Sequence, residues 1–132
     1  MIRDDVLKVA LPPGRRWKAL VRRADFLRIA ASGLRRVTPA FIVQAAPRGL
    51  HPTPALRIGF TASRKVGNAV ARNRAKRRLR ALADLVMADL DTSLDYVLVA
   101  RPETLIRAFP VMTADLGYAI KKITASPRAM AS

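Results

Sequence analysis

The side chains best suited to chemistry in this sequence are the cations gathered between positions 64 and 80. This stretch contains no acidic residue, and its basic residues are Arg64, Lys65, Arg72, Arg74, Lys76, Arg77, Arg78 and Arg80. A guanidinium group is planar and can donate paired hydrogen bonds to phosphate oxygens with defined geometry. The stretch therefore predicts a surface that binds the phosphates of a nucleic acid.

The charge of the whole chain supports the same interpretation. The 132 residues include 25 Lys+Arg and 9 Asp+Glu, which gives a net charge of +16. A small domain needs only about 2–8 charges to stay soluble, so a solvated basic surface is the weaker explanation. An anionic membrane is also less favoured than nucleic acid, because small residues separate the arginines and the chain has one Trp.

The composition excludes several kinds of catalytic site. There is no cysteine and only one histidine, His51, which lies in a predicted loop. Thiolate zinc sites, cysteine nucleophiles and most Ser-His-Asp triads are therefore excluded. The acidic residues are scattered, so we assign no catalytic residue and no metal ligand. Acidic residues near the N-terminus and the lack of a long apolar run favour a cytoplasmic protein.

Hydrophobic periodicity predicts the elements that must position the cations. We expect helices over 20–31, 68–89 and 110–123, and strands over 40–45, 56–63 and 95–100. This order predicts an α+β two-layer sandwich in one domain, 20–125, with the helices on one face of the sheet. A basic, loosely ordered arm (1–19) and a flexible tail (126–132) would flank the domain.

The second helix is predicted to be amphipathic, with Asn68 as its N-cap. A stripe of apolar residues at helical spacing would face the core: Ala75, Leu79, Leu82 and Val86. The opposite side would carry Asn73, Lys76, Arg77 and Arg80, flanked by Arg72, Arg74 and Arg78. The alternative interpretation of this side is a solvated charged face.

The strand that precedes this helix alternates strictly. One face would join the core through Leu56, Ile58, Phe60 and Ala62. The other face is small or polar, with Arg57, Gly59, Thr61 and Ser63, and it is suited to a ligand that docks against it.

The strand and helix together resemble a known signature. The stretch Arg57–Arg80 reads RIGFTASRKVGNAVARNRAKRRLR, and it contains R-N-R-x-K-R-x-x-R at Arg72, Asn73, Arg74, Lys76, Arg77 and Arg80. It resembles the protein subunit of bacterial ribonuclease P, and the resemblance continues less densely from Leu20 to the last helix. The resemblance implies a roughly four-stranded sheet (ribosomal protein S5 domain 2-like) with a left-handed βαβ crossover.

The resemblance also implies a function. The family removes the 5′ leader from precursor tRNA as part of an endoribonuclease whose catalyst is an RNA subunit that uses Mg²⁺. Its protein subunit binds that RNA and the leader, so the implied partners are the catalytic RNA and precursor tRNA, with neither DNA nor membrane. The implied RNA-binding residues are Arg64, Lys65, Arg72, Asn73, Arg74, Lys76, Arg77 and Arg80. The implied leader-binding groove contains Phe26, Arg57, Thr61 and Ser63.

Two positions depart from the family pattern in this groove. Ala30 and Gln44 stand where the family often has an aromatic residue. Stacking on the leader would then be weaker, or replaced by hydrogen bonds and Arg57. Core packing is the alternative role for Phe26.

Two other classes of protein remain open from the residues alone. A ribosomal or RNA-chaperone protein would have the same composition, and the R-N-R helix in its strand context favours ribonuclease P over it. A DNA-binding regulator would need a short helix packed before its recognition helix. A strand is predicted there instead, which disfavours a regulator.

Overall fold

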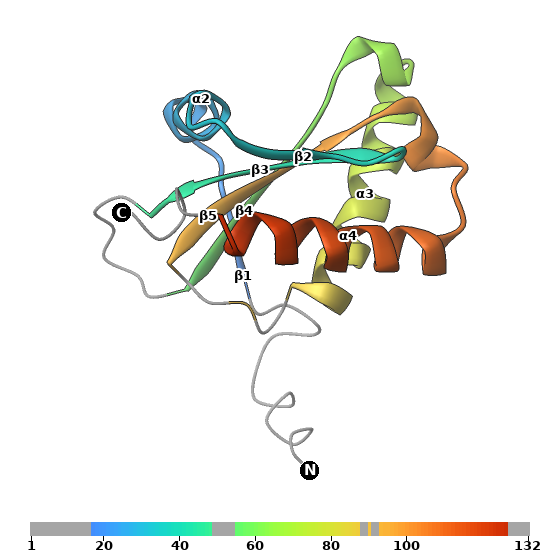
Figure 1. Cartoon of the computed structure of the whole chain (residues 1–132). Helices are drawn as coiled ribbons and strands as arrows, with labels where there is room; N and C mark the ends of the chain where they lie inside the picture. The colour runs from blue at the N-terminus through green and yellow to red at the C-terminus, as the bar shows by residue number, and fades with distance from the viewer. Residues whose placement is uncertain (1–16, 49–54, 88–89, 91–92, 127–132) are drawn as a thin grey trace, which may run out of the picture.

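The computed structural model describes residues 17–48, 55–87, 90 and 93–126. They form one five-stranded sheet with the strand order β1-β4-β5-β3-β2 (Figure 1). The strands are β1 (Trp17–Ala19), β2 (Leu34–Val37), β3 (Phe41–Pro47), β4 (Leu56–Ala62) and β5 (Leu94–Ala100). The helices are α2 (Arg23–Ala31), α3 (Ala69–Val86) and α4 (Phe109–Thr124), with short 3-10 turns η1 (Arg64–Val66) and η2 (Pro102–Leu105).

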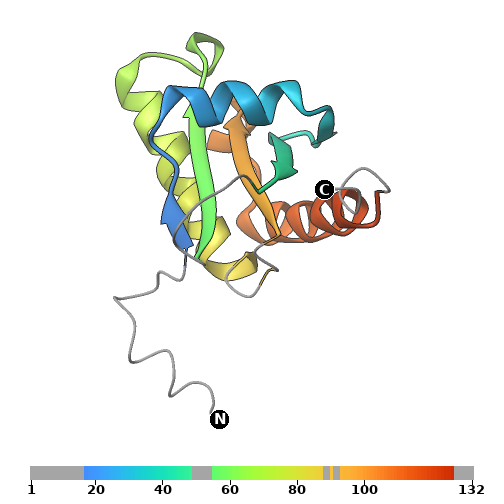
Figure 2. The same ribbon diagram turned by 90° about the vertical axis from the view of Figure 1, so that its left-hand side faces the viewer.

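The helices lie on both faces of the sheet. Helices α3 and α4 cover one face, and α2 crosses the other (Figures 1 and 2). The expectation of helices on one face only is therefore wrong. The cause is a small second core, in which Ile29 of α2 packs with Leu20, Ala46 and Val97. The α+β class and all six predicted elements are confirmed, with ends that shift by a few residues.

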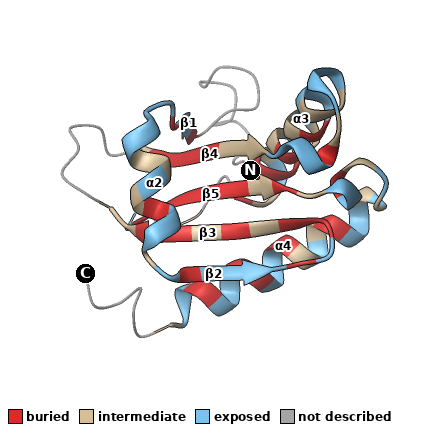
Figure 3. Cartoon of the chain, turned by 90° about the horizontal axis from the view of Figure 1, so that it is seen from above, coloured by how far each residue is buried: buried red, intermediate tan, exposed pale blue. Residues whose placement is uncertain are grey.

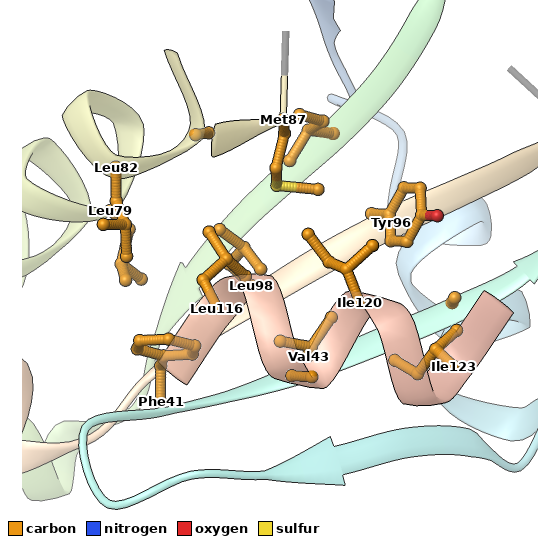
Figure 4. Packing of buried hydrophobic residues seen from close by; sticks show 14 of the residues in the cluster. Phe41, Val43, Leu79, Leu82, Met87, Tyr96, Leu98, Leu116, Ile120 and Ile123 are labelled. Atoms are coloured by element: carbon orange, nitrogen blue, oxygen red, sulfur yellow. The ribbon is translucent and has the colours of Figure 1, made fainter. Parts of the chain in front are cut away.

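The main core lies between the sheet and the α3–α4 layer. Figure 4 shows Phe41, Val43 and Leu98 from the strands meeting Leu79 and Leu116 from the helices. All five side chains are completely buried. Burial of a large apolar side chain contributes roughly 1.5–3 kcal/mol, so this layer anchors α3 to the sheet.

Two of the five strands, β1 and β2, were not predicted from the sequence. Strand β1 pairs in parallel with β4, so the last three residues of the predicted arm belong to the sheet. Strand β2 pairs antiparallel with β3. Both are short, with one buried residue each, and their pairing depends on a neighbouring strand rather than on their own pattern. The rest of the arm and tail predictions, 1–16 and 127–132, lie outside the described residues.

The βαβ crossover between β4 and β5 has an uncommon handedness. These strands are parallel neighbours, and α3 joins them on the face opposite α2. In Figure 3 the sheet is seen from the α2 side with α3 behind it. Seen from the α3 side with both strands pointing up, β5 lies to the left of β4, so the crossover is left-handed. About 98% of such crossovers are right-handed, so only the family resemblance predicted this one.

Candidate nucleic-acid interface

A tight junction between β4 and α3 positions the first cations. The side chain of Ser63 accepts a hydrogen bond from the backbone of Lys65 and so caps η1. Gly67 then adopts a φ of 142°, which favours glycine. Asn68 begins α3 by accepting a 2.9 Å hydrogen bond from the backbone N–H of Ala71, as predicted for an N-cap. Arg64 and Lys65 are therefore held at the start of the helix, and both are exposed.

Helix α3 presents the predicted faces. Ala75, Leu79 and Leu82 are buried, and Val86 is half-buried. Asn73, Arg74 and Arg77 are exposed on the outer side, while Lys76 is half-buried. We call the exposed set, Arg64, Lys65, Asn73, Arg74 and Arg77, the α3 surface.

Three other arginines of the helix have partners within the protein. Arg72 Nη1 donates to the carbonyl oxygen of Gly67 at 2.9 Å. Arg78 donates to the carbonyl oxygens of Leu105 and Arg107 and so ties α3 to the segment before α4. The guanidinium of Arg80 lies 5.7 Å from the ring centre of Phe60. Arg72 and Arg80 each keep free donors at the half-buried edge of the helix.

A groove opens on the other face of the sheet, between α2 and the carboxyl halves of β4 and β5. Its volume is about 540 Å³. The wall on the α2 side is formed by Val21, Arg23, Phe26, Leu27 and Ala30, and the sheet contributes Gln44, Phe60, Thr61, Val97 and Val99. Val21 is 82% exposed and Leu27 is 55% exposed, so the wall on the α2 side presents apolar side chains to solvent.

Phe26 lies over a glycine. A Cβ atom added at Gly59 would lie 2.7 Å from two carbon atoms of the Phe26 ring, so the absent side chain makes room for the ring. Phe26 also packs against the second core. Phe26 is thus half-buried, contributes to core packing and also lines the groove. Its role in leader binding stays a prediction.

The structure places the four predicted groove residues differently. Phe26 and Thr61 line the groove. Arg57 does not, because it is only 7% exposed and its guanidinium is bound to Asp95. Ser63 is also absent from the lining and instead caps η1. Arg57 and Ser63 therefore lie outside this groove, because strand alternation gives a face of the sheet but not what covers it. A role of either residue in leader binding stays a prediction.

Sequence reasoning missed most of the α2 wall. No groove residue was predicted at Val21, Arg23 or Leu27. One signal was available in the sequence: Leu27 and Ile29 lie about 200° apart on a helix, so both cannot face the same core.

An ion-pair cluster lies beneath α2, and we define it as Asp25, Arg28, Arg57 and Asp95. Arg57 donates to both carboxylate oxygens of Asp95, at 3.1 and 2.7 Å, and Arg28 donates to Oδ2 at 2.6 Å. Burial of the carboxyl opposes its charged form, but the hydrogen bonds from Arg57 and Arg28 outweigh it and hold the pKa of Asp95 below its usual value. The hydrogen bond to Asp95 raises the pKa of Arg57.

The carboxylates of the described residues have partners within the protein. Besides Asp25 and Asp95, Asp84 accepts from Trp17, and Glu103 and Asp115 pair with Arg107. No group of three or more His, Asp or Glu among the described residues could hold a metal ion. Nor does this part of the chain contain a helix long and apolar enough to span a membrane.

The fold and these two surfaces together define an α+β protein of the RNA-binding class. A family model described as Ribonuclease P matches residues 15–124. The ribonuclease P protein component of Paramagnetospirillum magneticum is 47% identical over 113 residues, which cover 83% of this chain and 85% of that protein. That of Ruegeria pomeroyi is 47% identical over 108 residues, covering 80% and 86%. The RNase P protein from Thermotoga maritima superposes with a TM-score of 0.64 at 26% identity, covering 80% of this chain and 96% of that one.

The chain therefore belongs to the ribonuclease P protein family. It is part of an endoribonuclease that acts on tRNA precursors, in which it assists an RNA subunit.

Proposed function

We propose that the chain serves this endoribonuclease through two binding surfaces. The α3 surface binds phosphates of the catalytic RNA subunit. The groove beneath α2 binds the single-stranded 5′ leader of precursor tRNA. The protein carries no catalytic group in this scheme.

The α3 surface suits a folded RNA. Asn73, Arg74 and Arg77 are exposed on the outer side of α3, which the main core anchors to the sheet. Arg64 and Lys65 are exposed on η1, directly before the helix. The nearest carboxylate of α3, Asp84, lies two turns beyond Arg77 and accepts the Trp17 hydrogen bond. Among the described residues no unpaired carboxylate competes with phosphates that dock here, and each phosphate contact releases counterions.

The groove suits one strand of unpaired nucleotides. Phe26 offers a ring face on which a base can stack, and such stacking tolerates every base. Gln44 and Thr61 can donate and accept hydrogen bonds at base edges. Arg23 supplies a cation at the rim for a phosphate. With Ala30 and Gln44 in place of aromatic residues, hydrogen bonding takes a larger share of the contacts.

The observation that carries the proposal is the continuity of the two surfaces. Thr61 lines the groove, and Arg64 and Lys65 follow it within four residues, at the end of the same strand. A strand of RNA that leaves the groove at this end meets the α3 surface at once. One protein can therefore contact the catalytic RNA and the leader together.

The chemistry falls to the RNA subunit. Phosphodiester hydrolysis by a two-metal site needs carboxylates that hold ions about 3.5–4 Å apart, whereas the described carboxylates are already paired with cations or an indole. We propose that Mg²⁺ is bound by the RNA subunit and the substrate. The protein then raises affinity for the precursor and favours assembly when Mg²⁺ is scarce.

Reconstitution tests the proposal. The protein is combined with a bacterial ribonuclease P RNA at low Mg²⁺, and cleavage of precursor tRNA is followed at the 5′ junction. We expect the protein to stimulate cleavage at that junction, and addition of the same concentration of a polyarginine peptide is the control for charge alone. Equal stimulation by the peptide, or none by the protein, would contradict the proposal.

A further inference from the structure

We propose that Arg28 and Asp95 are positioning residues for the groove, because they fix α2 on the sheet and so hold Phe26 over Gly59. The inference rests on the proposed function of the groove. Neither residue lines the groove, so they act through α2 rather than by touching the RNA.

The strand register places the ion-pair cluster beside the groove floor. Asp95 pairs with Ala46 on β3, and Lys18 of β1 pairs with Arg57 on β4, so these residues form one row across the sheet. Two residues along each strand, Gly59, Val97 and Gln44 form the next row. Successive rows two residues apart lie on the same face. The charged row therefore lies one step from the residues beneath Phe26.

Arg28 joins α2 to this charged row. Its Nη2 atom donates to Asp95 Oδ2 at 2.6 Å, and its Nη1 atom donates to the carbonyl oxygen of Pro47 at 3.0 Å. Asp25 lies one turn earlier on α2. Its Oδ1 atom is 3.4 Å from Nη2 of Arg28 and 3.9 Å from Nη2 of Arg57. The two aspartates and two arginines have no net charge together, and each ion has a partner. The cluster and the hydrogen bond from Arg28 to Pro47 therefore join three strands to α2.

Helix α2 has few other attachments. Ile29 is its one buried residue, and its N-cap, Arg22, makes no side-chain capping hydrogen bond. Asp25 and Arg28 alternate along the helix with Phe26 and Ala30, which face the groove. At 100° per residue these pairs occupy adjacent sides of the same two turns. A tilt that follows loss of the Arg28 contacts must therefore move Phe26.

Arg28→Ala is the variant that isolates this effect. Asp95 keeps both hydrogen bonds from Arg57, so no buried charge is left alone, whereas Asp95→Asn would remove the nearer of the two counter-charges of Arg57. Arg36→Ala is the matched control. It removes one positive charge from an exposed position on β2, and Arg36 pairs with Val43 of the main core rather than with the groove row.

The experiment compares binding of the reconstituted holoenzyme to precursor tRNA and to mature tRNA, which lacks the leader. We expect Arg28→Ala to lower the preference for precursor roughly tenfold, since small displacements of positioning groups have effects of this order. Assembly with the catalytic RNA should stay within about twofold, because α3 is untouched. Arg36→Ala should change neither quantity, and Arg28→Lys should restore part of the preference.

A double variant separates positioning from loss of stability. If Arg28 acts by placing Phe26, Arg28→Ala should have little further effect on precursor preference in a Phe26→Ala background. Additive losses would overturn the inference, and so would an unchanged preference in Arg28→Ala or a loss matched by an equal loss of assembly. An unchanged preference in Phe26→Ala alone would instead contradict the proposed function of the groove.

Discussion

The indole Nε1 atom of Trp17 donates a 2.8 Å hydrogen bond to Asp84 Oδ1, which joins β1 to α3 across 67 residues of sequence. The Trp17 ring also lies 5.1 Å from the ring centre of Phe60, over which Arg80 stacks. The short edge strand and the helix that carries the α3 surface are therefore attached to each other as well as to the core.

Replacing Trp17 with Phe tests this attachment. A phenyl ring remains, but the pyrrole part of the buried indole and its hydrogen bond to Asp84 are lost, so we expect the free energy of unfolding to fall by about 1–3 kcal/mol. Urea denaturation followed by circular dichroism measures the change. No change in the denaturation midpoint would show that the hydrogen bond adds nothing beyond ring packing.

The α3 surface should account for much of the salt dependence of assembly. Replacing Arg74 and Arg77 together with Ala should weaken binding to the catalytic RNA and reduce the slope of log K against log salt by about 1.4–1.8 if each contacts a phosphate. Arg72 is a less clean choice because it also bonds to Gly67. Lys121→Ala with Lys122→Ala, at the exposed end of α4, removes the same charge and should leave the slope unchanged. Equal slopes in the wild type and in both double variants would contradict the proposal that the α3 surface binds the catalytic RNA.

A side chain at Gly59 should displace the ring of Phe26. In Gly59→Ala the added Cβ would meet the ring at 2.7 Å, so we expect a loss of about 1–3 kcal/mol in stability and a lower preference for precursor tRNA. Thermal unfolding and the binding comparison measure the two effects. Adding Phe26→Leu should restore stability but not the preference, and a failure to restore stability would place the clash elsewhere.

The ion-pair cluster should give the protein an acid-sensitive component of stability. Because the pKa of Asp95 is lower in the folded protein than its ordinary 3.8, the unfolded chain binds this proton more readily. The contribution is complete above that value and is lost as the pH falls through the folded pKa. The stability difference between the wild type and Asp95→Asn should therefore shrink below about pH 4. A stability difference between the two proteins that stays constant down to pH 2 would contradict this.

Sequence analysis predicted the helix that carries the cations because both of its signals are local. The apolar spacing of Ala75, Leu79 and Leu82 and the cap at Asn68 depend on residues within a few turns. Burial of Arg57 depends instead on Asp95, which is 38 residues away on a strand whose register the sequence does not show. Gly59 was the available hint, since a glycine inside a strand often marks a close approach.

The placement of α2 shows the same limit. Its sequence indicates a helix, but its side of the sheet depends on the small cluster around Ile29 and on ion pairs to two strands. Strand β2 follows directly from that placement, because the chain leaves α2 at Ser32 beside Ala45 of β3. Local periodicity in the sequence shows neither the side of the sheet on which α2 lies nor the position of β2 beside β3.

The polar edge strands have a consequence for how copies of this protein behave at high concentration. Strand β1 is three residues long, and β2, which ends the sheet formed by the described residues, exposes Arg35 and Arg36 to solvent. Short, positively charged edges repel one another and disfavour the strand-to-strand addition that begins aggregation. Part of the arginine excess therefore keeps free subunits apart before they meet RNA.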